Sequence, residues 1–317
     1  RAQSPMYFNA AGEWAPYVHK TPVHNQELPT FKDPSNTRDL RNAYQREARR
    51  RWNQVIRLVG VILIDQQALQ LNPMYLNVDL PNQVGTSQNT PEQTAAALIA
   101  FLERLQNAIL NEPEGSGFGR ERWQNAYVRR AYARGVFQTE TALRQAGLTI
   151  PERELAQMLN SQFHADALKA LRIRQYDLFA TVQQDFSNDL APRMREILLN
   201  GYAEQQTPQQ IARALRDEIN LRTEKLAKVR ADMITRTEIV RANTQARVNT
   251  LTERGVDQSI WILSSAPCDQ CQAIAAGNPY RTDEIMGIYP AHPRELCSIG
   301  PDTTSEAFRA TQRERIA

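Results

Sequence analysis

The three cysteines of this chain, Cys268, Cys271 and Cys297, lie near its end, together with His292, one of only four histidines. They stand in the stretches "SSAPCDQCQAIAAGNP" and "YPAHPRELCSIGP". C-x-x-C spacing lets two thiolates face one point, and His292 with Cys297 completes a Cys₃His set, a standard closed tetrahedral zinc site. The spacing therefore predicts a structural metal centre with zinc as its metal.

Two other interpretations of these residues stay open. C-x-x-C at a helix start after a strand suits a redox dithiol. The βαβ pattern expected around such a dithiol is absent, and redox chemistry needs neither His292 nor Cys297. The thiols could also be inert, because a buried cysteine behaves as a small hydrophobic residue. The gathering of all the cysteines in one short part of the chain favours the metal.

The composition limits the class of protein. A length of 317 residues allows two or three domains at ~150 residues each. An odd cysteine count argues against a disulfide framework, and the net charge of +3 says little about partners. The longest apolar run, "LVGVILI", is far shorter than the ~18 residues of a membrane span. We expect an intracellular protein that does not enter a membrane.

The metal-site residues follow a long series of predicted helices. Only 13 glycines and 7% aromatic residues favour a largely helical chain. "TPEQ" at 90–93 and "TPQQ" at 207–210 are capping boxes with proline at the first helical position. The predicted helices begin at about Thr37, Thr90, Trp123, Pro151, Thr207 and Glu224, with a kink or restart at Pro192 and stops near Gly147 and Gly255. The apolar stripe of the first of these helices is Tyr44, Ala48, Trp52, Val55 and Val59.

The period changes only after Gly255, where "SIWILSS" at 259–265 predicts a short strand. At the other end, residues 1–37 carry many prolines among scattered aromatic residues, which predicts an extended arm. We expect this arm to lie on a partner surface rather than to be a free tail. The predicted fold class is mainly α, with an elongated multi-helix body followed by a small α+β, zinc-stapled C-terminal module.

The order of motifs from about residue 200 to 300 resembles a known family. "RTEIVRANTQARVNTLTERGVDQSIWILSSAPCDQCQAI" is followed by "PAHPRELC". This order is similar to the C-terminal domain of the phage Mu F-like head morphogenesis family, also called minor capsid proteins. The matching positions are Arg236, Thr237, Glu238, Gly255, Trp261, Cys268, Cys271, His292, Pro293 and Cys297.

One position departs from the family pattern. The closing element of the family usually has cysteines three and five positions after the histidine. Here the first of these positions is Glu295 and the second is Cys297. If Cys297 is the ligand, the four-ligand set is intact. If the missing cysteine was the ligand, Glu295 would have to coordinate instead, or the site would hold no metal.

The residue patterns predict the arm and the helical body of a domain plan, and the resemblance implies its C-terminal domain and a role. The plan is an extended arm (1–37), a helical body (38–204), a Mu F-like head morphogenesis domain with the Cys/His module (205–301) and a tail (302–317). The implied role is that of a low-copy virion protein without catalytic activity, located in the phage head near the portal and in the host cytoplasm during assembly. The implied partners are the portal protein, the major capsid protein and packaged double-stranded DNA.

Other residues suggest contacts rather than catalysis. Two basic stretches beside aromatic residues, "REARRRW" and "GRERWQNAYVRRAYARG", could face phosphates, an acidic protein surface or water. The residues predicted to make such contacts are Arg46, Arg49, Arg50, Arg51, Arg129 and Arg130. Arg236 or Glu238 is expected to tie its helix to the zinc module, with a solvated face as the alternative. The three remaining histidines, His19, His24 and His164, are expected to be ordinary polar residues.

Two alternative functions are carried beside the first. A DNA-binding ejection protein would use the Arg-rich helices as its main binding surface, and its DNA affinity would depend strongly on salt. A metal-dependent nuclease would need an open coordination position and a nearby base. Four protein ligands leave no open position, and the sequence offers no evident base.

Overall fold

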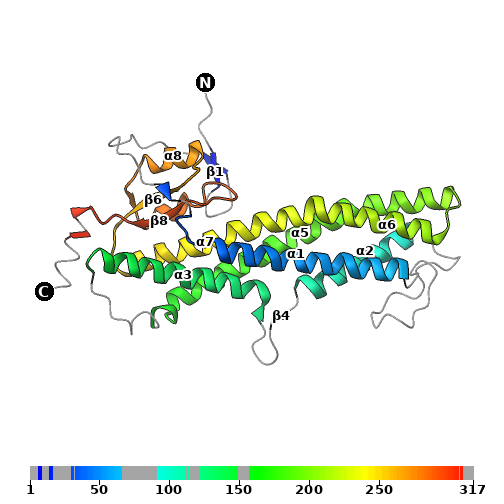
Figure 1. Cartoon of the computed structure of the whole chain (residues 1–317), viewed down its shortest axis with the longest axis horizontal. Coiled ribbons are helices and arrows are strands. Elements are labelled where there is room, and N and C mark those ends of the chain that lie inside the picture. Colours follow the sequence, from blue (N-terminus) through cyan, green and yellow to red (C-terminus); the bar gives the residue numbers. More distant parts are fainter. Residues whose placement is uncertain are drawn as a thin grey trace, which may run out of the picture. The chain divides into compact units, whose positions relative to one another are not determined.

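The computed structural model describes residues 6–8, 14–16, 30–31, 33–65, 91–111, 113–114, 121–148, 157–306 and 308–309. The predicted polar break before the "TPEQ" cap and the helix start predicted at Pro151 lie outside these residues. The chain is mainly helical, with a small sheet near its C-terminal end (Figure 1). The predicted fold class, mainly α followed by a small α+β module, is confirmed.

The helices follow the predicted starts and stops closely. The capping box at Thr207 forms as predicted, with Gln210 N–H bonded to Thr207 Oγ1 at 3.3 Å and Thr207 N–H bonded to Gln210 Oε1 at 2.8 Å. The predicted restart at Pro192 does not occur, because one helix runs through it. The helices are α1 (Arg38–Gly60), α2 (Pro91–Leu110), α3 (Trp123–Gln145), α5 (Gln162–Ala203), α6 (Pro208–Arg222), α7 (Val229–Glu253) and α8 (Asp269–Ala275), with short helical turns η1 (Val61–Asp65), η3 (Thr223–Lys228) and η4 (Ile285–Gly287).

The main sheet is built around the strand predicted from "SIWILSS". This strand, β6 (Gln258–Ser264), pairs antiparallel with β8 (Ser298–Pro301) and β7 (Tyr280–Arg281). A short strand of the N-terminal arm, β3 (Thr30–Phe31), joins it in parallel at Leu263–Ser264. Two hairpins complete the strands: β1 (Met6–Phe8) with β2 (Trp14–Pro16), and β4 (Pro113–Glu114) with β5 (Glu121–Arg122).

The chain forms two compact units, each assembled from separated segments. Unit 1 comprises Arg1–Ala43, Gln124–Gln175 and Thr235–Ala317, and unit 2 comprises Tyr44–Trp123 and Tyr176–Ile234. The domain boundaries expected from the sequence assume contiguous segments, and they stay a prediction. The candidate metal ligands all belong to unit 1.

Unit 2 has an aromatic core supplied by the predicted apolar stripe of α1. Tyr44 and Trp52 are fully buried, and the other three residues of the stripe are at most 2% exposed, which confirms the stripe. The Tyr44 ring lies edge-on to Trp123 with centroids 5.3 Å apart, and Trp52 meets Phe186 at the same distance. Such edge-to-face pairs add to the stabilisation that area burial gives.

Unit 1 is organised around the part of α7 that it contains. Every residue from Glu238 to Thr244 is buried, so this part of the helix has no solvent face although it carries several polar side chains. Helix α3 approaches so closely at Gly135 that a Cβ there would lie 2.2 Å from the Asn243 carbonyl oxygen. Figure 1 shows β6, β8 and α8 gathered beside the later turns of α7. Val240 and Val248 of α7 share their hydrophobic cluster.

Arg247 joins four segments of unit 1. Its guanidinium donates to the Gln138 side-chain oxygen of α3 at 2.6 Å and to the Pro34 carbonyl before α1 at 3.0 Å. It also donates to the Ile299 carbonyl of β8 at 3.3 Å and to Asn243 Oδ1 one turn earlier on α7 at 3.0 Å. Burial lowers the pKa of Arg247 to about 10. The charge is thus held by neutral acceptors drawn from separate parts of the chain.

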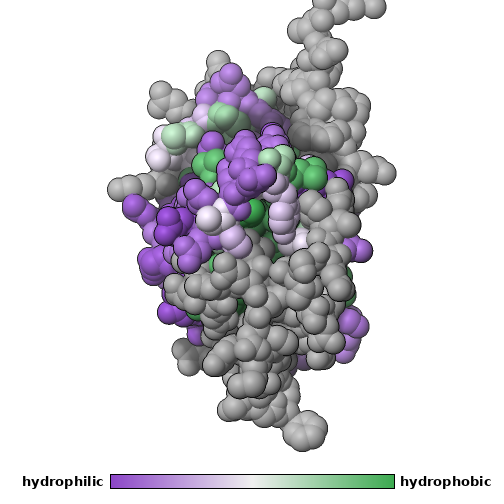
Figure 2. Space-filling view, turned by 90° about the vertical axis from the view of Figure 1, so that its right-hand side faces the viewer, coloured by the Kyte–Doolittle hydropathy of each residue, from purple (hydrophilic) through white to green (hydrophobic). Residues whose placement is uncertain are grey.

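The surface of the described residues is mixed. Figure 2 shows a face on which hydrophilic residues predominate and hydrophobic ones are scattered among them. Large exposed side chains in the described parts include Phe137, Ile173 and Val229, at 47%, 51% and 48% exposure. Within the described helices, none has the length and hydrophobicity that crossing a membrane requires.

We predict that Arg247→Met lowers the free energy of unfolding of unit 1 by about 1–3 kcal/mol, because partly buried acceptors on α3, β8 and the segment before α1 lose their donor. Urea unfolding followed by circular dichroism measures the loss. Arg281→Met is the matched control, since this side chain of the same unit is 66% exposed. We expect the control to leave stability unchanged within error, and equal losses in both variants would contradict the role given to Arg247.

Candidate metal centre

The C-x-x-C motif folds as the start of a helix. Cys268 is the N-cap residue of α8, with extended backbone angles, and its Sγ accepts the Cys271 N–H at 3.4 Å. An N-cap residue and the residue three positions later lie over the same first turn. Both thiols therefore face one point, as the spacing predicts. Cys268 is exposed and Cys271 is buried.

His292 brings the second half of the site to this point. Its Nε2 lies 3.2 Å from Cys268 Sγ and 3.3 Å from Cys271 Sγ. Its Nδ1 lies 2.8 Å from the Pro293 carbonyl oxygen, which can only accept a hydrogen bond. Nδ1 therefore carries the proton, and Nε2 presents a lone pair to the two sulfurs. Metal-binding histidines are commonly oriented in this way.

A second group of donors shares Cys271 with the first. Cys271, Glu295 and Cys297 lie with one donor atom each within 4.8 Å of one another, and all three are buried. Glu295 Oε1 lies 3.3 Å from Cys271 Sγ, while Glu295 Oε2 accepts the Ala291 N–H at 2.6 Å. The structure thus places the four predicted ligands in two groups that share Cys271, and it adds Glu295, the residue at which the sequence departs from the family pattern.

Protons are shared unevenly inside this group. The hydrogen bond from Cys271 lowers the pKa of Cys297 to about 6, and Ser264 and the Trp261 indole also favour the thiolate. The pKa of Cys271 is raised, first by this hydrogen bond and then by burial. Burial raises the pKa of Glu295 to about 8. Ligands must lose their protons to bind a metal, so a cation would replace the protons that hold these side chains together.

The donor atoms of Cys268, Cys271 and His292 are spaced as three ligands of a tetrahedral metal. A zinc ion about 2.3 Å from sulfur and about 2.0–2.1 Å from nitrogen holds the two ligand atoms roughly 3.5 Å apart. The sulfur–nitrogen distances of 3.2 and 3.3 Å are shorter by only a few tenths of an ångström. The cluster could therefore hold a metal ion.

The "RTE" segment contacts the Cys/His module through its middle residue. Thr237 Oγ1 accepts the Arg294 N–H at 3.1 Å, in the loop between His292 and Cys297. Glu238 instead pairs with Arg174 of α5 at 3.3 Å, and Arg236 is half-buried. We expected Arg236 or Glu238 to join this helix to the Cys/His module. The contact seen in the structure is made by Thr237 instead, through its side-chain hydroxyl.

Trp261 supports the site from the sheet. Its ring packs against Tyr289 with centroids 5.3 Å apart, and the Tyr289 hydroxyl donates to the Cys297 carbonyl at 3.1 Å. The side-chain amide of Asn278 bonds both backbone groups of Trp261, at 2.7 and 3.0 Å. The predicted family residue Trp261 thus links β6 to the segment that carries the ligands.

The arginines predicted to contact DNA or a partner have different surroundings. On α1, Arg46, Arg49 and Arg50 are exposed, whereas Arg51 is 5% exposed. Arg51 donates to the Ile109 carbonyl at 2.5 Å and lies 4.8 Å from the centre of the Trp123 ring. Arg51 is therefore withdrawn from the predicted surface, because its position on the helix points it into the core of unit 2.

The remaining arginines keep to the surface. Arg49 bonds Asp232, and Arg50 bonds Glu47 at 2.6 and 2.7 Å. On α3, Arg129 and Arg130 are exposed, and Arg130 lines a wide hollow beside the first turn of α1. Contact of these side chains with DNA or a partner stays a prediction.

A histidine that the sequence gave no special role is fully buried in unit 1. His164 Nδ1 lies 2.6 Å from the Tyr132 hydroxyl, and its Nε2 lies 3.0 Å from Glu253 Oε2. Asn249 Nδ2 donates to the same hydroxyl at 2.8 Å. His164 is thus a partnered core residue, and it is not among the candidate ligands. His19 and His24 lie outside the described residues.

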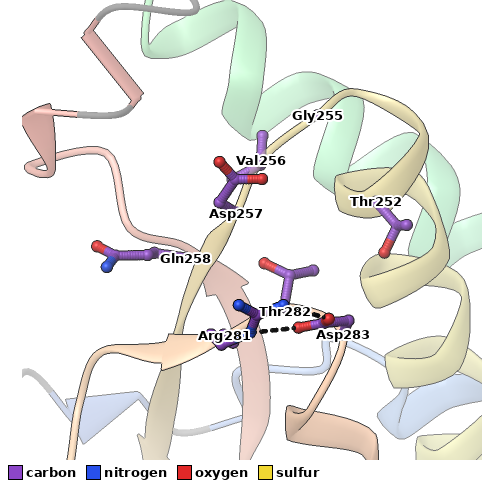
Figure 3. A pocket seen from close by; sticks show the side chains of 8 residues that line it. All are labelled: Thr252, Gly255, Val256, Asp257, Gln258, Arg281, Thr282 and Asp283. Atoms are coloured by element: carbon purple, nitrogen blue, oxygen red, sulfur yellow. Dashed lines mark hydrogen bonds and ion pairs between the residues drawn. The ribbon is translucent and has the colours of Figure 1, made fainter.

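A separate hollow of about 540 Å³ opens where Gly255 turns the chain from α7 into β6 (Figure 3). Arg281 bonds Asp283 at 2.7 and 3.1 Å on one wall. The hollow is lined by Thr252, Gly255, Val256, Asp257, Gln258, Arg281, Thr282 and Asp283. None of the five candidate metal donors lines it, so it is not an entrance to the metal centre.

Comparison of the chain with protein-family models, with curated proteins and with solved structures finds no match in any of the three. The resemblance to the Mu F-like family stays an expectation that rests on motif order and spacing. What the structure adds is the geometry of the Cys/His cluster and of the helix and strand around it.

We predict that Cys271→Ser abolishes metal binding, because Cys271 belongs to both donor groups. Elemental analysis of purified protein should fall from about one ion per chain to background, as expected when a ligand of a four-coordinate site is lost. Ser264→Ala is the control, since Ser264 lies beside Cys297 at 3.9 Å but belongs to neither group. Full metal content in Cys271→Ser would mean that Cys271 is not a ligand.

Proposed function

We propose that this chain is a minor capsid or head morphogenesis protein of a tailed bacteriophage. It docks at the portal vertex or the capsid interior through its helical body and Pro-rich arm, and it aids head assembly and genome packaging or delivery. A structural zinc ion holds its C-terminal module. The observation that carries the proposal is that the elements of the resemblance share one hydrophobic core.

That core contains residues from each part of the motif order. Val240 comes from the "RTE" helix, Trp261 from the strand, and Cys271 and Cys297 from the two halves of the Cys/His site. The segment around His292 also contributes to this cluster, through Ile285, Tyr289 and Ala291. Motifs that are separate in the sequence thus act as one structural unit, which supports their common origin in a single family domain.

A structural role for the metal is supported by the number of donors. Cys268, Cys271 and His292 need only one of Glu295 and Cys297 to complete four ligands. A catalytic zinc keeps an open position for water, and a structural one does not. The segment from α8 to β8 has little regular structure, and short segments of this kind commonly depend on a metal for their fold. We therefore propose a protein without enzymatic activity.

Cys297 is the proposed fourth ligand. Glu295 Oε2 already accepts the Ala291 N–H, which fixes this carboxylate within its own loop. Three thiolates with one imidazole form a standard structural zinc set. Cys297→Ser should therefore lose zinc and melt at a lower temperature, whereas Glu295→Gln, which keeps an acceptor for Ala291, should retain zinc. The reverse result, measured by elemental analysis and thermal unfolding, would make Glu295 the ligand.

The assembly role is tested in particles of the virus that encodes the chain. Mass spectrometry of purified heads should find the chain at low copy, and the purified chain should bind portal rings from the same genome. An isogenic deletion should produce heads that deliver DNA poorly, with rescue by the wild-type gene. Absence of the chain from heads, together with no binding to portal, would overturn the proposal even if the zinc site is real.

A further inference from the structure

The turn that follows His292 contains a residue in an unfavourable backbone conformation. Pro293 and Arg294 are its turn residues, and Arg294 has a φ of 64°, in the left-handed region. This region is crowded for most residues that carry a Cβ, and glycine and asparagine adopt it most readily. The Arg294 side chain is exposed, so core packing does not hold it there. Contacts of the turn's backbone must therefore stabilise this conformation.

One peptide group of this turn is hydrogen-bonded on both sides. The Pro293 carbonyl oxygen accepts a hydrogen bond from His292 Nδ1 at 2.8 Å, and the Arg294 N–H donates to Thr237 Oγ1 at 3.1 Å. The carbonyl and the N–H belong to the same trans peptide, so they lie in one plane and point in opposite directions. A rotation of this peptide therefore changes both hydrogen bonds together.

The reversed orientation of this peptide would relieve the backbone and misplace the histidine. Reversing the peptide between two turn residues exchanges a positive φ at the second residue for a negative one. Arg294 would thus return to an ordinary conformation, and the Pro293 carbonyl would turn away from His292 Nδ1. The Nε2 lone pair would then no longer be held toward the sulfurs of Cys268 and Cys271.

We propose that Thr237 of the "RTE" segment is a positioning residue of the metal centre. Its hydroxyl holds the 293–294 peptide in the orientation that directs His292 Nε2 to the two sulfurs. Thr237 is not one of the candidate donors, so it acts through this peptide alone. The inference rests on the metal centre proposed above. Partners that orient metal-binding histidines commonly change metal affinity roughly 10- to 100-fold.

Competition with a chromophoric chelator, with zinc as the probe, tests the role of Thr237. Thr237→Val keeps the side-chain shape but cannot accept the Arg294 N–H, so it should weaken zinc binding roughly 10- to 100-fold. Thr237→Ser keeps the hydroxyl and should restore most of the affinity. Thr252→Val is the matched control, because the Thr252 hydroxyl donates to the Val248 carbonyl of its own helix at 3.0 Å. Equal affinities in the two valine variants would overturn the inference.

A pair of variants at Arg294 tests the strain in the turn. Asparagine suits the left-handed region, whereas valine, with its β-branched side chain, does not. Both substitutions remove the same exposed charge, so Arg294→Asn should bind zinc more tightly than Arg294→Val. Arg294→Asn should also recover part of the affinity lost in Thr237→Val. If Thr237→Val does not fold, the pair still decides, because equal zinc affinities would show that this turn does not limit binding.

The failure of this inference differs from the failure of the metal centre. Wild-type protein that binds no zinc would overturn the metal centre and, with it, the role of Thr237. Zinc binding by the wild type with an unchanged affinity in Thr237→Val would overturn the role of Thr237 alone.

Discussion

The packing of unit 1 depends on a helix that is polar and yet enclosed. All residues from Glu238 to Thr244 are buried, so each polar group on this stretch of α7 needs a partner inside the protein. Leaving one unsatisfied costs about 1–3 kcal/mol. Arg247 illustrates the consequence, because its acceptors come from α3, β8 and the segment before α1. A packing that moves any of these segments loses a partly buried hydrogen bond of Arg247, which favours a single arrangement.

The Cys/His module depends on the same helix. Its hydrophobic cluster includes Val240 and Val248, and its ligand loop is bonded to Thr237. The module itself consists of a short helix, short strands and connecting loops. A metal ion that joins the start of α8 to the loop around His292 would link the two least regular parts of this module. Core packing and metal binding would then stabilise the same contacts.

The arginines of the described helices differ in their exposure to solvent. In unit 1, Arg241 is buried, and the half-buried Arg247 is held by acceptors from other segments. In unit 2, Arg51 lies against the Trp123 ring, one residue after two exposed arginines. Consecutive arginines on a helix therefore do not form one basic surface, because successive side chains point about 100° apart around the helix axis.

The sequence by itself determined the local features of this protein. The Thr207 capping box, the glycine stops and the apolar stripe of α1 depend on neighbouring residues, so they could be predicted from spacing. Cys268, Cys271, His292 and Cys297 could be predicted as one cluster for the same reason, since metal geometry restricts ligand spacing. The caps, stops and stripe are each decided within a few turns of chain, whereas the spacing of the four cysteine and histidine residues is restricted by the metal that they would share.

Only the tertiary structure decided which distant groups meet. Glu295 lies beside Cys271, and Thr237 of the "RTE" segment accepts a hydrogen bond from the loop after His292. Arg247 donates hydrogen bonds to α3 and β8. No periodic pattern marks these residues, because a helix buried on all sides has no hydrophobic face to reveal its orientation. Their roles follow from the cost of burying polar groups and charges, and that cost is set by segments far away in the sequence.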